Sequence, residues 1–144
     1  MTFPRATIPI TPFQIAHSDA ELAALTTLLR LSPLGPPTYE NGPSRTSNYG
    51  ISLRQMRDLR DAWLAYDWRQ AERRLNAMPQ FVARVPDEAT EMEVHFLAYT
   101  SGHAEAVPVL LLHGWPGMGC FELQPMVEHL QKHAKQPLDI IIPR

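Results

Sequence analysis

The stretch Val107-Pro-Val-Leu-Leu-Leu-His-Gly-Trp-Pro-Gly117 decides the fold class of this chain. Its first six residues are continuously apolar without alternation, the pattern of a parallel strand buried on both faces of a sheet. After the loop, apolar side chains recur at helical spacing over 123–130, and a second apolar run occupies 138–142. The order strand, helix, strand predicts a βαβ unit in a mixed, mostly parallel α/β sheet.

Two segments upstream of this unit have the period of strands. Residues 81–85 and 92–99 alternate apolar with polar side chains, as half-buried strands do. The intervening residues 86–90, Pro-Asp-Glu-Ala-Thr, suit the loop of a hairpin. In the helix that follows the apolar stretch, Pro125 is expected in the first turn, where its missing N–H is tolerated.

The first half of the chain predicts three short helices. Ser18, Ser52 and Asp67 each begin a capping box, because Glu or Gln follows three residues later. An apolar stripe at helical spacing follows each start, and prolines follow the first and third helices as stop signals. We therefore expect an α-helical arm over about residues 18–78.

Composition and charge exclude several classes of protein. A net charge of -2 gives no electrostatic case for binding nucleic acid. No apolar run approaches the roughly 20 residues that span a bilayer, and the first residues lack the apolar core of a signal peptide. The single cysteine, Cys120, fits a reducing compartment, so we expect a cytoplasmic protein. Prolines gather in 4–12 and 33–43, which we interpret as irregular surface segments.

The loop over 113–117 has the residue types of an oxyanion hole, a set of N–H donors that stabilises negative charge on a substrate oxygen. Gly114 allows the backbone to turn close to a bound substrate. Pro116 fixes φ and removes a competing donor, so the N–H of Trp115 is left to point into a pocket. The alternative interpretation is a generic Gly-Pro turn after a strand.

Taken together, these motifs resemble one family. His113-Gly-Trp-Pro-Gly117 followed by Phe121-Glu122 resembles the oxyanion loop of epoxide hydrolases in the α/β-hydrolase superfamily. Further matches to the N-terminal region of the microsomal and juvenile-hormone branch are Pro12-Phe13, Ser18-Asp-Ala-Glu-Leu22, Tyr66-Asp-Trp68, Glu72, Leu75-Asn76 and Pro79-Gln-Phe81. The resemblance extends from about Pro12 to Pro143, in order and at family spacing.

The resemblance implies an α/β fold: a helical arm followed by the first strands and the first helix of an incomplete α/β-hydrolase fold. It divides the chain into an extended tail (1–11), the N-terminal region of the family (12–122) and the truncated start of the core (123–144). The strand over 107–112 would then lie at an open sheet edge that is neither charged nor covered. We expect such a chain to self-associate, to be poorly soluble or to need a complementing C-terminal fragment.

The resemblance also implies hydrolysis of a small apolar epoxide to a vicinal diol, without cofactor or metal. Family members attack the epoxide with an Asp, activate water with a His that an acid orients, and protonate the epoxide oxygen with two lid tyrosines. None of these residues has a counterpart in this chain, so we expect it to be inactive alone. Only the oxyanion loop carries over, with Trp115 as the N–H donor and with His113, Gly114, Pro116 and Gly117 shaping the loop.

Two other functions stay open. The chain could be a non-catalytic truncated product or an interaction fragment, or it could be part of an α/β-hydrolase that acts on esters. The two enzymes differ in the nucleophile, which would be encoded downstream of this sequence. An Asp at that turn would support an epoxide hydrolase, and a Ser would favour an esterase.

Three further residues are candidates for chemistry in other contexts. His129 and His133, four residues apart, could bind a metal, but we interpret them as part of a solvated helix face because no third ligand is evident. Cys120 near a helix start could be a thiolate nucleophile. No paired His or Cys forms a recognisable motif with it, so we interpret it as a small buried side chain.

Trp63, Trp68 and Glu122 also allow two interpretations each. The two tryptophans could line a hydrophobic tunnel, but we expect them to pack within the arm. Glu122 could orient the oxyanion loop or simply favour the start of the helix that follows. We favour the second role for Glu122.

Overall fold

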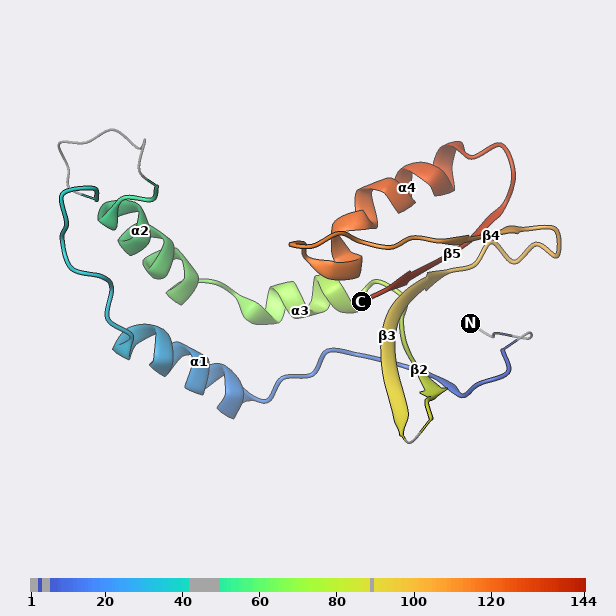
Figure 1. Ribbon diagram of the computed structural model, residues 1–144, viewed down its shortest axis with the longest axis horizontal. Helices are drawn as coiled ribbons and strands as arrows, with labels where there is room; N and C mark the ends of the chain where they lie inside the picture. The colour runs from blue at the N-terminus through green and yellow to red at the C-terminus, as the bar shows by residue number, and fades with distance from the viewer. Residues whose placement is uncertain (1–2, 4–5, 42–49, 89) are drawn as a thin grey trace. The chain divides into compact units, whose positions relative to one another are not determined.

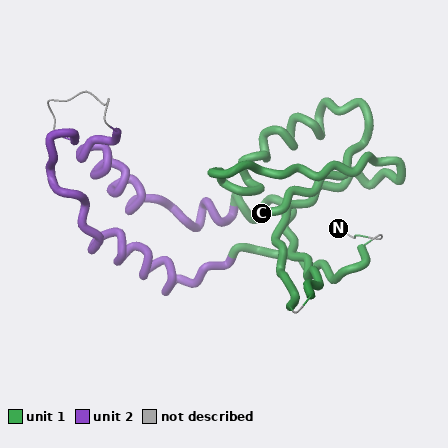
Figure 2. The backbone as a smooth tube through the Cα atoms, in the orientation of Figure 1, with its two compact units in different colours: residues 1–15, 74–144 green, residues 16–73 purple. Residues whose placement is uncertain are grey.

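The computed structural model describes residues 3, 6–41, 50–88 and 90–144 (Figure 1). The chain divides into two compact units, one from residues 16–73 and one from residues 1–15 together with 74–144 (Figure 2). Within the described ranges, no helix is long and apolar enough to cross a membrane.

The three predicted helices are present as α1 (Asp19–Leu31), α2 (Leu53–Leu64) and α3 (Trp68–Asn76). Both capping boxes predicted for the first two are confirmed. The side chains of Ser18 and Ser52 each accept the N–H three residues later, and the side chain there accepts the N-cap N–H in return. Because these N–H groups have no partner inside the helix, each cap stabilises its helix by about 1 kcal/mol.

The apolar stripes of α1 and α2 contain no fully buried residue. Residues from the end of α1 and from α2 line a groove of about 630 Å³, and Trp63 in this groove is 56% exposed. Trp68 is half-buried and meets the ring of His17 edge-on, with centroids 5.5 Å apart. Packing within the arm is thus confirmed for Trp68, whereas Trp63 lines an open groove.

Polar side chains of α3 satisfy the backbone of the irregular segment before α1. The carboxylate of Glu72 accepts the N–H of His17 at 3.0 Å and a hydrogen bond from Arg69 at 2.7 Å. The side-chain amide of Asn76 both accepts from and donates to the backbone of Ile15, each at 2.8 Å. Glu72 and Asn76 therefore hold an irregular stretch in place by supplying partners for its backbone groups.

The described residues form one sheet of five strands in the order β1-β2-β3-β5-β4. The strands are β1 (Ile10–Pro12), β2 (Gln80–Pro86), β3 (Glu91–Tyr99), β4 (Val107–Leu110) and β5 (Leu138–Pro143). β2 and β3 are antiparallel, which confirms the predicted hairpin. β4 and β5 are parallel and α4 (Gln124–His133) connects them, which confirms the predicted βαβ unit. Pro125 lies in the first turn of α4, as expected.

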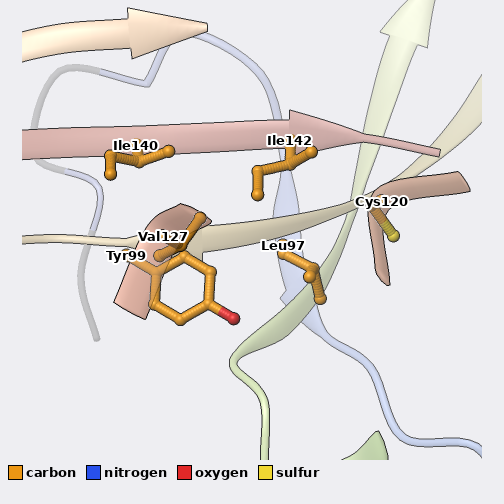
Figure 3. Packing of buried hydrophobic residues seen from close by; sticks show 6 residues of the cluster. All are labelled: Leu97, Tyr99, Cys120, Val127, Ile140 and Ile142. Carbon is orange, nitrogen blue, oxygen red and sulfur yellow. The ribbon is translucent and has the colours of Figure 1, made fainter. Parts of the chain in front are cut away.

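The core lies on both faces of the sheet. Figure 3 shows the cluster on the face that meets α4 and the short 3-10 helix η1 (Gly119–Leu123), made of Leu97, Tyr99, Cys120, Val127, Ile140 and Ile142. The buried residues of the opposite face are Phe81, Ala83, Phe96 and Ala98. Since neighbours along β3 alternate between the two clusters, this strand is buried on both faces near its end.

β1 was not expected from the sequence. Residues 4–12 contain three prolines and were interpreted as irregular, but Ile10–Pro12 pairs antiparallel with β2, with Ile10 opposite Ala83. Pro9 joins the pairing through its carbonyl oxygen, which accepts the N–H of Arg84 at 3.0 Å. Proline is tolerated here because β1 is an edge strand, where one row of backbone groups needs no ladder partner.

The burial of β4 also differs from the expectation for residues 107–112. Val109 and Leu111 pack against the core, but Leu110 is 61% and Leu112 is 72% exposed. The expected burial on both faces is therefore wrong for this chain. The reason is that only the face of β4 that carries Val109 and Leu111 is covered, and the opposite face is also partly open at Ile141 of the neighbouring β5, which is 39% exposed.

The open edge of β4 carries one built-in protection that we did not expect. The N–H of Val107 donates to the carbonyl oxygen of Pro137, just before β5, and the N–H of Leu111 donates to that of Ile141 in β5, both at 2.9 Å. Because backbone direction alternates along a strand, residues 108, 110 and 112 present their nitrogens to the open side. Pro108 has no N–H, so it removes one of the three donors from this edge.

The half-buried His95 on β3 belongs to a small polar network with Gln80. Gln80 is buried, and its Nε2 donates to the carbonyl oxygen of Leu75 at 2.8 Å. The other end of the amide, Oε1, lies 3.1 Å from His95 Nε2. Because an amide oxygen only accepts, His95 Nε2 must carry a proton and donate it to this bond. His95 Nδ1 is then a buried acceptor that has no partner among the described residues.

We expect this network to make stability depend on pH. Burial, and next the positive charge of Arg144, lower the pKa of His95 below its ordinary value of 6.5. As the pH falls through 6.5, the unfolded chain takes up a proton that the folded chain resists. The contribution of His95 to the free energy of unfolding should therefore be fully present above pH 6.5. It should decrease as the pH falls below 6.5 toward the pKa of His95 in the folded chain.

Urea titrations of the chain between pH 7.5 and 5 measure this dependence. His95→Gln should reduce the slope of the free energy of unfolding against pH below pH 6.5. The same substitution at the exposed His103 should leave this slope unchanged. An equal slope in His95→Gln and in the original chain would contradict the assignment to His95.

Candidate functional site

The loop His113–Gly117 leaves the sheet at the carboxyl end of the parallel pair β4 and β5. The N–H of Leu111 makes a hydrogen bond to Ile141 just before the loop begins. In open α/β sheets, ligands bind outside the carboxyl ends of the strands. The five predicted site residues are contiguous and lie at this end, and the side chain of Trp115 is 94% exposed.

The side chain of His113 fixes the direction of the peptide between Gly114 and Trp115. His113 Nδ1 lies 2.9 Å from the carbonyl oxygen of Gly114. Because a carbonyl oxygen only accepts, Nδ1 must carry the proton and donate. The C=O and N–H of a planar trans peptide point in opposite directions. The N–H of Trp115 therefore points away from the ring of His113.

Gly114 and Pro116 flank Trp115. Trp115 and Pro116 are joined by a cis peptide, and Pro116 has no N–H of its own. A Cβ placed on Gly114 would meet nothing within 4 Å. Contacts among the described residues therefore do not require glycine at this position.

Glu122 combines the two roles considered from the sequence, because it lies in the first turn of η1, as we favoured, and also contacts the loop before that helix. Its Oε2 accepts the N–H of Met118 at 3.0 Å, so the carboxylate reaches back to the loop. A Cβ on Gly117 would stand 2.6 Å from the same oxygen, which is closer than real Cβ contacts allow. The carboxylate therefore contacts the loop, and a side chain at position 117 would have to displace it. The spacing of Gly117 and Glu122 was visible in the sequence, but their contact was not.

The other candidates for chemistry do not join this site. Cys120 is fully buried, and burial raises the pKa of its thiol, so it is a core side chain, as expected. His129 and His133 are exposed, with ring centroids 4.4 Å apart. In the part of the chain that the structure describes, no group of three His, Cys, Asp or Glu residues could hold a metal ion.

Comparison with known proteins identifies the family. Residues 10–121 match the family model described as the epoxide hydrolase N terminus. The chain belongs to this family. A protein of Dothistroma septosporum whose name describes an epoxide hydrolase is 35% identical over 144 residues, covering 96% of this chain and 34% of its own. The juvenile hormone epoxide hydrolase of Bombyx mori is 31% identical, covering 93% and 29%.

Solved structures of epoxide hydrolases share the fold. The Aspergillus niger epoxide hydrolase matches with a TM-score of 0.80 and 36% identity, covering 96% of this chain and 35% of that one. The chain therefore has the fold of the N-terminal part of an α/β-hydrolase epoxide hydrolase, and the resemblance that the motifs implied is confirmed. It spans about a third of the length of the relatives it matches.

Proposed function

We propose that this chain supplies the oxyanion loop for the hydrolysis of a small apolar epoxide to a vicinal diol. The observation that carries the proposal is the contact of His113 Nδ1 with the carbonyl oxygen of Gly114, which turns the N–H of Trp115 outward at the carboxyl end of β4. The relatives described above carry the names of epoxide hydrolases, which favours this substrate class over esters.

The role of the Trp115 N–H follows from where charge develops. In the two-step reaction that the family resemblance implies, a carboxylate opens the epoxide and forms an ester, and water then attacks the ester carbonyl. The carbonyl oxygen becomes negative in that second step. An N–H that is already directed at this oxygen stabilises it without reorganisation, which is the main advantage of a preorganised donor. His113 provides the preorganisation here.

We expect the 144-residue chain by itself to form no diol from styrene oxide above the rate in buffer. The resemblance places the nucleophile, the water-activating His and the lid tyrosines at positions that have no counterpart in this chain, and an oxyanion donor alone cannot open an epoxide. Chromatographic measurement of the diol tests this. Reproducible turnover that a single substitution in this chain abolishes would overturn the assignment of the chemistry.

An active context is needed for tests of the loop. A suitable protein is a chimera that joins this chain to the part of the Aspergillus niger epoxide hydrolase that the chain does not cover. The similarity over the shared part, 36% identity at a TM-score of 0.80, supports this design. Diol formation by this chimera is the first requirement of the proposed function.

We also propose that the open edge of β4 is a contact surface of the isolated chain. Leu110 and Leu112 are exposed, and their N–H groups face away from β5. An apolar edge with outward donors is a template for a strand of another chain. The partner in this proposal is a second copy of the chain, paired edge to edge.

A further inference from the structure

We propose that Glu122 is a positioning residue for the oxyanion loop. Its carboxylate accepts the N–H of Met118 and fills the space above Gly117, and it thereby fixes the peptide between these two residues. In this role Glu122 helps to hold the N–H of Trp115 in its direction. The inference rests on the proposed function, in which that N–H is the oxyanion donor.

The part of the loop that Glu122 holds is the part with the greatest backbone freedom. Met118 lies between Gly117 and Gly119, and Gly119 adopts a φ of 69°. Glycine lacks the Cβ that restricts other residues, so two glycines around one residue leave many conformations open. A hydrogen bond to the N–H in the middle of this segment removes most of them.

The two halves of the loop are thus fixed by separate side chains. His113 holds the Gly114–Trp115 peptide from the strand side, and Glu122 holds the Gly117–Met118 peptide from the helix side. Between Met118 and Glu122 the chain is anchored because Cys120 is fully buried in the core. Loss of either side-chain contact would leave Trp115 attached to a flexible segment on one side.

The contact also explains why a negatively charged side chain is placed here. A carboxylate oxygen accepts a backbone N–H more strongly than a neutral oxygen does. Glu122 also lies in the first turn of η1, directly before α4, where a negative charge is favourable. The bond to Met118 is the contact through which this side chain acts on the loop.

The first test measures amide hydrogen exchange at Met118 in the 144-residue chain by NMR. Glu122→Ala should speed exchange at Met118 by about tenfold, because the N–H loses a charged acceptor. Glu122→Gln should retain most of the protection, since its amide oxygen can still accept. Gly117→Ala should expose the same N–H by displacing the carboxylate. The exposed Glu105→Ala is the matched control and should leave Met118 unchanged.

The second test measures steady-state kinetics of the chimera. Glu122→Ala should lower kcat about tenfold with KM within twofold, and Glu122→Gln should restore most of kcat. An effect on folding alone would instead lower the melting temperature and the yield and leave kcat per folded molecule unchanged. Unchanged Met118 exchange, or unchanged kcat, in Glu122→Ala overturns the positioning role. Failure of the proposed function would appear separately, as full turnover by a Trp115→Pro chimera.

Discussion

Replacement of Trp115 by proline in the chimera is expected to lower kcat for epoxide hydrolysis by about 10²–10³-fold. Proline has no N–H, so the substitution removes the donor that the His113 contact directs outward. The loss of stability should be modest, because the Trp115 side chain is 94% exposed and contributes little packing. Steady-state kinetics and thermal unfolding measure the two effects.

Trp115→Phe is the matched control for this prediction. It changes the same exposed side chain but keeps the N–H, so kcat should remain within a few-fold of the original value. If Trp115→Pro prevented folding altogether, the loop would be a determinant of the fold instead of oxyanion machinery. Equal losses of kcat in the two variants would mean that the side chain, and not the N–H, matters.

The second large effect concerns the oligomeric state of the 144-residue chain. We expect it to elute as an oligomer in size-exclusion chromatography with light scattering, and Leu110→Lys to shift it toward the monomer. Leu110 is 61% exposed on β4, and lysine at a sheet edge opposes pairing with another strand. In the associated form, the amides of Leu110 and Leu112 should exchange slowly, and dilution should release them.

A leucine of the other unit provides the control for this edge. Leu28 on α1 is 63% exposed, so Leu28→Lys makes the same change in charge and in side chain on a helix instead of on a strand edge. It should not alter the oligomeric state. A monodisperse monomer whose Leu110 and Leu112 amides are strongly protected would show that the edge assignment is wrong.

Local patterns in the sequence predicted most of the secondary structure. Capping boxes at Ser18 and Ser52 marked helix starts, because both partners of the box lie three residues apart. Alternating and continuous apolar runs predicted β2 to β5, and the Gly-Pro loop after β4 indicated the site. The composite of motifs indicated the family, which the match over residues 10–121 confirms.

The features that sequence patterns missed depend on contacts between distant residues or on the edge of a sheet. β1 is hidden by its prolines, which are tolerated only because the strand lies at an edge. The apolar residues of β4 predicted burial on both faces, but burial depends on what covers the strand. The hydrogen bond between Gln80 and His95 joins two residues that lie fifteen positions apart on neighbouring strands, so no local sequence pattern indicates it.

The site itself was predicted as a set of residues but not as a mechanism. Trp115 could be proposed as the donor from the motif, whereas the roles that we propose for His113 and Glu122 depend on side-chain directions. A histidine before a glycine, or a glutamate five residues after one, has many possible partners. Only the folded loop shows that each of these side chains fixes one peptide.

The most direct test replaces the amide of residue 115 in the chimera by an ester, through incorporation of the α-hydroxy analogue of tryptophan. This change removes the N–H of Trp115 and keeps its side chain, Pro116 and the His113 contact to Gly114. We predict that kcat for epoxide hydrolysis falls by about 10²-fold while KM changes little. A kcat within twofold of that of the unmodified chimera would contradict the assignment of this N–H to the oxyanion hole.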